Sequence, residues 1–441
     1  MTAPRIDGRG RHSPSLASLD ADSPRPQASV YGAPFWFTYV ANAAMMVAVS
    51  ILFRYADFVT YLGGSEFQLG LIVGVGMVGA LTMRMVQGVG IDQYGPRRVW
   101  LASVALFIAS LLCHLAITSI DSPAIYLVRV LMNTSIAGAF GASITYISLL
   151  APKHRVPELV GTLGTSGFLG TCLGPILGDY LFQGELTRGA VNNMFLAAAG
   201  TAGIALICAF FATRGAARPL AQPRPPVWSL LKQYHPGPML LVAVAMGFGV
   251  GMPHTFLRTY AAELNIDRIR FFFVAYAAMA FSVRLLTRRM AETHGIRTMV
   301  LLGLGCLAAS MLLYPLAMNE WTLAIPAGVA GFAHALLFPA VIGGGSISFP
   351  TRFRGLGATL MFAMFDLGNL VGQPAVGGML ELSRAVGLPA YPTMFVSMAL
   401  ILTSVAAIYA RMGQPALAME ASPELEGVQE LTPAPSAQEQ G

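Results

Sequence analysis

Twelve apolar runs divide this sequence, and each is long enough to cross a lipid bilayer as an α-helix. A helix needs about 20 apolar residues to span the hydrocarbon core. Only 11% of the residues are charged, against about 25% in a soluble domain, so little charge is left to cover a water-facing globule. The alternating pattern of a membrane β-barrel is absent. The sequence therefore predicts an all-α membrane protein with 12 transmembrane helices. The runs cover approximately residues 34–61, 66–87, 98–118, 123–149, 157–180, 190–213, 237–260, 269–288, 298–316, 321–344, 355–380 and 391–411.

Two charged breaks between apolar runs repeat each other at an offset of 200 residues. Arg84, Asp92, Gly95 and Arg97 recur as Arg284, Glu292, Gly295 and Arg297. Duplicated halves of this kind are typical of secondary transporters. We therefore predict two pseudo-symmetric six-helix halves, residues 31–213 and 237–411, joined by a polar linker over 214–236. Because the second copy has Arg288 in place of its first glycine, we expect the conformational switch to depend on the first copy.

The basic residues predict which side of the membrane each loop occupies. If the N-terminus is cytoplasmic, 20 of the 27 Lys and Arg residues fall on cytoplasmic arms, loops and inner span ends. Positive charge concentrates on the cytoplasmic side of membrane proteins. We therefore expect a multi-pass protein of the plasma (inner) membrane, with both termini and the linker in the cytoplasm. Residues 1–30 lack the apolar core of a signal peptide and are expected to be a disordered arm. Residues 412–441 are expected to be a disordered tail.

The remaining composition gives no reason to expect a cofactor, a metal or a nucleic-acid partner. The sidedness argument already accounts for the net charge of +6. The cysteines lie in four separate apolar runs, without metal-ligand spacing, and are expected to be small buried hydrophobes. The expected partners are the bilayer, a small solute and protons, and we expect a monomer to be functional. The four cysteines are Cys113, Cys172, Cys208 and Cys306.

The first charged break carries a motif that is fairly specific. It reads GVGIDQYGPRR over residues 88–98, and Gly95 permits a tight turn that a Cβ would block. This break resembles the loop signature of the major facilitator superfamily, a family of membrane transporters. The departure is Pro96, which stands where a basic residue is common. The resemblance implies a gating role for the two glycines, the acid and the two arginines, which are Gly88, Asp92, Gly95, Arg97 and Arg98.

Two further segments resemble the bacterial efflux and antiporter branch of the same superfamily. Gly174 and Pro175 lie in a string similar to the glycine–proline motif of proton-driven exporters, although Asp179 replaces its final glycine. A related string runs over 368–377. Such small residues either pack helices together or act in gating. Arg129 resembles the arginine of the family's fourth-span motif, but Asn133 stands where that motif has glycine.

The resemblance also implies how the first break acts. In this family the signature is thought to hold the two halves together at the cytoplasmic side. The eleventh run begins near Gly355 on that side, so its positive dipole end can face Asp92. Our hypothesis is that Asp92 stabilises the outward-open state by about a kcal/mol. On this hypothesis Asp92→Asn raises cytoplasmic accessibility.

Ionisable side chains within apolar runs are costly and are therefore candidates for function. The resemblance implies that the first, fourth, seventh and tenth runs line a central cavity. Simpler alternatives remain open: Arg54 and Arg258 can reach lipid headgroups, Asp57 can neutralise Arg54, and His334 can be an interhelical hydrogen-bond partner. His114 is expected to be a packing or rim residue. The substrate-binding candidates are Asn42, Arg54, Asp57, Arg129, Asn133, His254, Arg258 and His334.

Asp366 is the strongest candidate for a functional carboxylate. It lies roughly 16 Å into its helix at 1.5 Å per residue, and either pairs with Arg84 or takes a coupling proton, a role for which Asp57 is the second candidate. Arg84 and its counterpart Arg284 are expected to be structural. Three outer arginines face one acid, Asp57, and arginine binds carboxylates and phosphates in a bidentate manner. A substrate with an anionic group is therefore expected.

The predicted function is secondary active transport of a small organic solute by alternating access, coupled to protons and directed to export rather than import. A phosphate loop and the HExxH and GxSxG motifs are absent, so an ATP-driven pump and a membrane hydrolase are not indicated. We expect no enzymatic activity. Two alternatives remain: a multidrug/proton antiporter for amphipathic compounds, and a transporter-like protein that acts in sensing or assembly without transport.

Overall fold

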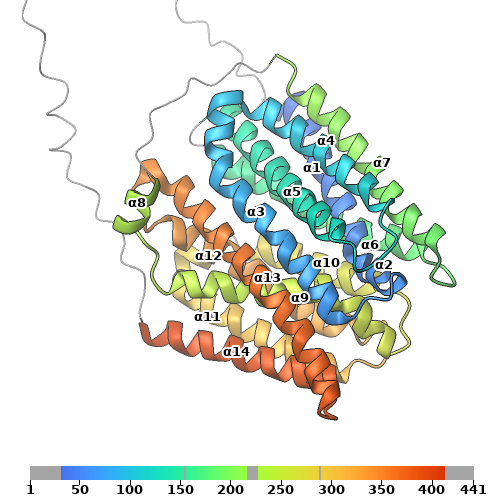
Figure 1. The fold of residues 1–441 in the computed structure, drawn as a ribbon. Helices are drawn as coiled ribbons and strands as arrows, with labels where there is room; N and C mark the ends of the chain where they lie inside the picture. The colour runs from blue at the N-terminus through green and yellow to red at the C-terminus, as the bar shows by residue number, and fades with distance from the viewer. Residues whose placement is uncertain (1–30, 153–154, 216–226, 288–289, 413–441) are drawn as a thin grey trace, which may run out of the picture.

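A computed structural model describes residues 31–152, 155–215, 227–287 and 290–412 (Figure 1). These ranges form helices and contain no strand. The expected disorder of 1–30 and 413–441 lies outside the described residues, as do residues 216–226 of the linker and Arg288. The side chains of Asp92 and Glu292 are also outside the described part.

Helices α1 to α7 form the N-terminal half. The first predicted span consists of α1 (Ala33–Ile51), the 3-10 turn η1 (Leu52–Arg54) and α2 (Tyr55–Tyr61). A short helix that the sequence did not predict, α8 (Val227–Gln233), follows this half. The other helices of the half are α3 (Glu66–Tyr94), α4 (Pro96–His114), α5 (Ala124–Leu150), α6 (Val156–Leu181) and α7 (Arg188–Ala212).

Helices α9 to α14 form the C-terminal half. Across the described residues, eleven helices are long and apolar enough to cross a membrane. The predicted span over 269–288 is α10, which has 17 residues, so the count of twelve spans stays a prediction. The helices are α9 (Met239–Glu263), α10 (Arg270–Leu286), α11 (Met290–Leu313), α12 (Ala324–Ser346), α13 (Arg354–Ala385) and α14 (Ala390–Met412).

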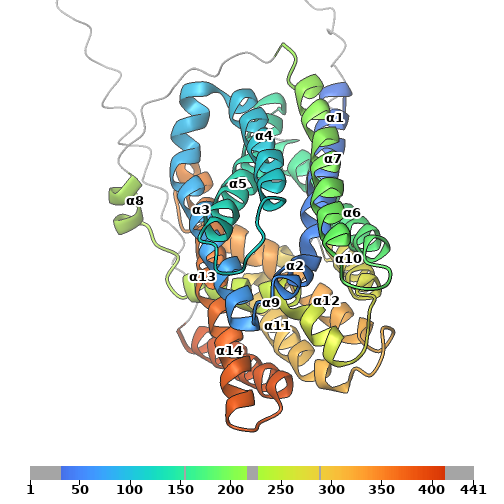
Figure 2. The same cartoon turned by 45° about the vertical axis from the view of Figure 1, so that its right-hand side comes forward.

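The two halves meet along two pairs of helices. Helix α3 lies beside α13, and α6 lies beside α10 (Figures 1 and 2). Gly70 and Gly377 let α3 and α13 approach closely, because a Cβ on Gly70 would lie 2.3 Å from the Gln373 carbonyl oxygen and one on Gly377 would lie 2.4 Å from the Glu66 carbonyl oxygen. Small residues allow such backbone contact between membrane helices.

The turns at the two charged breaks have the same backbone geometry. Gly95 has φ 81° and ψ 153°, and Gly295 has φ 77° and ψ 156°. Pro96 follows Gly95 as the first residue of α4, where its fixed φ and missing N–H suit a helix start. The matching turns, 200 residues apart, support the duplication that the sequence indicated.

Three local expectations differ from the structure. The break expected from Gly88 is shorter, because α3 continues to Tyr94 and the turn is confined to Gly95. Pro253, a residue type that usually interrupts helices, lies inside α9 without ending it. The break occurs instead in the first span, at the 3-10 turn η1.

Candidate functional site

The break at η1 directs neighbouring side chains toward different partners. The Phe53 ring meets the His254 ring of the C-terminal half, with centroids 4.7 Å apart. Arg54 points toward α6, and the Tyr55 ring faces Arg129 on α5. In a continuous α-helix each side chain is rotated from the one before by a constant angle. The 3-10 turn changes this angle, and Phe53, Arg54 and Tyr55 therefore contact groups from both halves.

Arg54 is enclosed at this break. It is 1% exposed, and its Nε lies 3.4 Å from a carboxylate oxygen of Asp57 and 3.4 Å from one of Asp179. Its NH2 group donates a 2.6 Å hydrogen bond to the carbonyl oxygen of Asp267, in the other half. The alternative in which Arg54 reaches lipid headgroups is therefore wrong.

Asp57 joins the two halves through Arg258. The Arg258 Nε lies 2.9 Å and 3.3 Å from the two carboxylate oxygens, and NH1 donates to the Ile266 carbonyl oxygen at 3.3 Å. Arg258 is therefore engaged by protein groups rather than headgroups. Asp57 neutralises Arg54, as one alternative expected, and also binds a second arginine from the opposite half.

Asp179 caps the N-terminus of α10. Its carboxylate accepts hydrogen bonds from the backbone N–H groups of Ile269 at 3.3 Å and Arg270 at 2.9 Å. A carboxylate at this position satisfies unpaired N–H groups and interacts favourably with the helix dipole. The sequence prediction missed Asp179, although an acid inside an apolar run is the same signal that identified Asp366.

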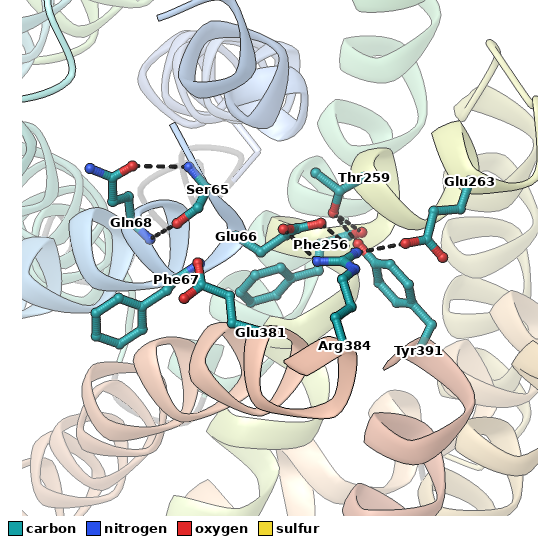
Figure 3. A network of polar contacts seen from close by, with 10 residues as sticks. All are labelled: Ser65, Glu66, Phe67, Gln68, Phe256, Thr259, Glu263, Glu381, Arg384 and Tyr391. Atoms are coloured by element: carbon teal, nitrogen blue, oxygen red, sulfur yellow. Dashed lines mark hydrogen bonds and ion pairs between the residues drawn. The ribbon is translucent and has the colours of Figure 1, made fainter. Parts of the chain in front are cut away.

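A second set of charges lies closer to the surface at the same end (Figure 3). Arg384 near the end of α13 holds Glu66 of α3 through two 2.8 Å hydrogen bonds and Glu263 of α9 through one of 2.6 Å. Glu381 accepts a 3.4 Å hydrogen bond from the backbone N–H of Phe67. Arg384 is about two-fifths exposed, so these pairs contribute less than the enclosed ones.

These two layers fasten the halves at one end of the bundle. We call it the closed end: the end at which α2, α6, α9 and α13 finish and α3 and α10 begin. Under the predicted sidedness it is the outer end. The buried layer is Arg54, Asp57, Asp179 and Arg258, and the surface layer is Glu66, Glu263, Glu381 and Arg384.

Farther along the same seam, Arg84 on α3 pairs with Asp366 on α13. Arg84 is about 27 Å from Glu66 along the helix at 1.5 Å per residue. Its guanidinium also lies 4.8 Å from the centroid of the Phe362 ring. The pairing that the sequence allowed is therefore present, and a proton-carrying role for Asp366 stays a prediction.

Arg129 differs from the other buried arginines. It is 9% exposed, and its Nε, like that of Arg54, has no hydrogen-bond partner among the described residues, so the difference lies in the charges nearby. The guanidinium lies 4.3 Å from the Tyr55 ring centroid, and NH1 lies 3.9 Å from the Met132 sulfur. Among the described side chains, no carboxylate lies within ion-pair distance of it. Asn133, one turn later, is 6% exposed and reaches only the Met77 sulfur, at 4.0 Å.

The other candidates are distributed over both halves. The His254 Nδ1 lies 2.8 Å from the Val250 carbonyl oxygen, and the His334 Nδ1 lies 2.8 Å from the Tyr276 hydroxyl. The His334 contact is the interhelical hydrogen bond that one alternative expected. Asn42 is buried on α1. His114 is fully buried against Phe195, which makes it a packing residue rather than a rim residue.

The gating candidates divide into turn and packing residues. Gly95 forms the turn described above, Arg97 lies 5.3 Å from the Phe210 ring centroid, and Arg98 is exposed. Gly174 packs α6 onto α1 inside the N-terminal half, because a Cβ there would lie 2.4 Å from the Ser50 Cβ. Pro175 lies inside α6 without ending it. The contact of Gly174 favours the packing alternative for this motif.

The fold is shared with several solved transporters. It is similar to a POT family peptide transporter described as auto inhibited, with a TM-score of 0.71 and 12% identity over 88% of this chain and 99% of that chain. It is also similar to the nucleoside transporter NupG, with a TM-score of 0.67 and 14% identity over 86% of this chain and 99% of that chain. A third similar structure is the inward open conformation of the xylose transporter XylE from E. coli, with a TM-score of 0.66 and 15% identity over 87% of this chain and 96% of that chain.

At these identities the solved structures show the fold alone. A comparison with curated proteins finds no match to the sequence. The family model of the Major Facilitator Superfamily matches residues 35–373, which is most of the described chain. The sequence motif, the paired halves and this match lead to one conclusion: the chain is a multi-pass membrane protein that belongs to the major facilitator superfamily.

Proposed function

We propose that the protein moves a small organic solute across the plasma (inner) membrane by alternating access, as a secondary active transporter. The observation that carries the proposal is the buried layer of charges at the closed end. Asp57 and Arg258 come from opposite halves, and so do Asp179 and the start of α10. A bundle with only a structural role has no need for an ionic contact at the junction of its halves, where apolar side chains pack as well or better.

The predicted sidedness makes the closed end the outer one, so this conformation is the inward-facing state of the cycle. Opening the outer end requires Asp57 to separate from Arg258 and Asp179 to separate from α10. In the transport step, therefore, these contacts between the halves break and new contacts between the halves form at the opposite end.

Proton coupling is assigned to Asp366, with Asp57 as the second candidate. Each is a buried carboxylate that pairs with an arginine across the seam between the halves. A proton on either one removes an ion pair that holds the halves together, so protonation and conformation are linked. Export remains the favoured direction, as the resemblance to exporters implies.

The substrate is expected to bear an anionic group. Of the three arginines on which this expectation rested, one still supports it. Arg54 and Arg258 are neutralised at the closed end, so they no longer count as free cations. Arg129 remains as a buried cation without a carboxylate partner among the described residues. We expect a monomer to carry out the cycle.

The multidrug alternative is favoured by one observation, the aromatic surroundings of the two cavity histidines. His254 lies against Phe53 and Phe273, and His334 stacks on Phe338. Such rings suit amphipathic compounds. A flux measurement distinguishes the non-transporting alternative from the anion carrier and from the multidrug antiporter.

Proteoliposomes containing the purified full-length chain provide the test. A panel of labelled small organic acids and lipophilic cations is offered with and without an imposed pH gradient. Saturable flux of at least one compound, altered by the gradient and abolished in Arg258→Ala, supports the carrier. Binding without flux for every compound contradicts the carrier and favours the sensor.

A further inference from the structure

We infer that Arg129 is the recognition residue for a single carboxylate group on the transported solute. The inference rests on the proposed function and deepens it by naming the charge, the residue that binds it and the walls of the site. Arg129 is a buried positive charge that no carboxylate among the described residues balances.

A buried arginine is normally paired, because removing its charge from water costs several kcal/mol that only a partner of opposite charge recovers. Arg54 at the first-span break follows this rule, since it is flanked by Asp57 and Asp179. Arg129 has equivalent burial and, among the described residues, only a ring face and a thioether as partners. Its charge is left for a group from outside the chain.

The hydroxyl group of Tyr55 is engaged by His114 rather than by Arg129. The Tyr55 hydroxyl lies 3.3 Å from the His114 Nε2, and the His114 Nδ1 lies 2.7 Å from the Ser110 carbonyl oxygen. With Nδ1–H donating to that carbonyl, Nε2 accepts from the Tyr55 hydroxyl. The contact that Tyr55 makes with Arg129 in the structure is through its ring, which is a weaker partner than a carboxylate.

The close approach of Arg129 to α3 depends on a missing side chain. A Cβ on Gly76 of α3 would lie 2.7 Å from the Arg129 Cγ and 2.6 Å from the Asn133 Nδ2. The glycine thus permits Arg129 and Asn133 to lie together against α3. Asn133 has only a long sulfur contact in the structure and can donate a second hydrogen bond to a carboxylate.

The surroundings define the chemical class of the ligand. One guanidinium neutralises one negative charge, so a monoanion leaves no residual charge in the site, whereas a phosphate dianion would. Met77, Met132 and the Tyr55 ring provide adaptable apolar walls. A monocarboxylate with an apolar or aromatic body meets both conditions, because arginine binds a carboxylate group in a bidentate manner.

Binding and stability measurements on the detergent-purified full chain test the inference without any need for transport. The probes are benzoate and hexanoate, each matched to its neutral amide, benzamide or hexanamide. We expect at least one acid to raise the melting temperature of the wild type, and neither amide to do so. Arg129→Gln should weaken the binding of that acid about 10- to 100-fold, as the loss of a charge-assisted hydrogen bond requires.

Two further variants keep the test independent of a folding defect. Without ligand, Arg129→Met should raise the melting temperature, because it removes an unpaired buried charge. Gly76→Ala should weaken acid binding, whereas Gly200→Ala, where a Cβ meets nothing within 4 Å, should not. The inference is overturned if neither acid binds, if the amides bind equally well, or if Arg129→Met lowers the melting temperature. Acid binding without flux would contradict the proposed function alone.

Discussion

At the scale of single residues, Asp57 is the side chain on which the closed end depends most. It is the carboxylate that contacts Arg54 and also Arg258 from the other half. Breaking a buried ion pair by removing one partner costs about 3–5 kcal/mol. Asp57→Asn should therefore shift the balance between closed and open forms by roughly a hundredfold to several thousandfold, since about 1.4 kcal/mol is a factor of ten.

The labelling rate of a cysteine at Ile269, which is fully buried beside Asp179, measures this shift in a background without the native cysteines. We expect Asp57→Asn to raise the rate at least tenfold. Glu320→Gln is the matched control, because Glu320 pairs with Arg268 at the same end but within one half. Equal rates in the two variants would contradict the assignment.

A substitution of Asp366 distinguishes a proton-coupling role of this residue from a structural one. Asp366→Asn removes the carboxylate that pairs with Arg84 but keeps a side chain of the same shape. We expect accumulation driven by a pH gradient to be lost while solute exchange at equal pH persists. Asp121→Asn, at an exposed loop, should affect neither. Loss of both activities in Asp366→Asn, with a lowered melting temperature, would indicate a structural pair.

The sequence predicted part of this residue-level arrangement. The sequence left open that Asp57 neutralises Arg54, and the two side chains do interact. It could not place Asp57 against Arg258, because a contact across 201 positions depends on how each helix is rotated within the bundle. The sequence correctly showed more arginines than acids among the outer candidates. Because Arg54 and Arg258 pair with Asp57 and Asp179, Arg129 is the one of the three that has no carboxylate partner among the described residues.

At the scale of helices, the apolar runs predicted the spans to within a few residues, since burial in lipid requires a minimum apolar length. The 3-10 turn η1 was not predicted, because Leu52, Phe53 and Arg54 follow no local sequence rule for a break. Contacts with both halves stabilise these three residues in the 3-10 conformation. Proline was a misleading signal, since Pro253 lies within α9.

The glycines of the two charged breaks should be sensitive to substitution. Gly95 and Gly295 both have positive φ, which costs an ordinary L-residue about 1–2 kcal/mol. Gly95→Ala and Gly295→Ala should each lower the melting temperature in detergent. Gly90→Ala should lower it less or raise it, because Gly90 is helical with open space at its Cβ position. Equal effects at all three positions would contradict the turn assignment.

Helices α6 and α10 should close on each other in the opposite state. They touch at Asp179 and again where Phe168 meets Phe281, with ring centroids 6.5 Å apart. Gly164 and Gly161 lie one and two turns before Phe168, where a Cβ would meet nothing within 4 Å. This free surface is where the exposed Leu285 of α10 can dock when the other end closes.

Gly164→Leu should therefore hinder closure at that end and reduce the transport rate without a matching loss of solute binding. Flux in proteoliposomes and binding in detergent measure the two effects. Gly203→Leu on α7, another open glycine, is the control. Normal flux in Gly164→Leu would show that α10 docks elsewhere.

At the scale of the whole molecule, the two halves have similar backbone geometry at their charged breaks, but corresponding charged residues have different partners. Gly95 and Gly295 adopt the same geometry, yet Arg84 pairs with Asp366 whereas Arg284 contacts the Phe338 ring at 5.9 Å. The α3–α13 seam therefore carries an ion pair that its pseudo-symmetric counterpart, α6–α10, does not share at this position. The Asp92 hypothesis concerns the opposite end from the closed layer and stays a prediction.

Distances between spin labels at the two ends of the bundle test alternating access most directly. One label pair is placed at Leu62 and Leu388 near the closed end, and the other at Gln93 and Gly355 near the opposite end. We predict a short, narrow distance distribution for the first pair in the wild type. In Asp57→Asn the first distance should lengthen while the second shortens. If both distances stay unchanged, or lengthen together, the contacts of Asp57 do not control alternating access.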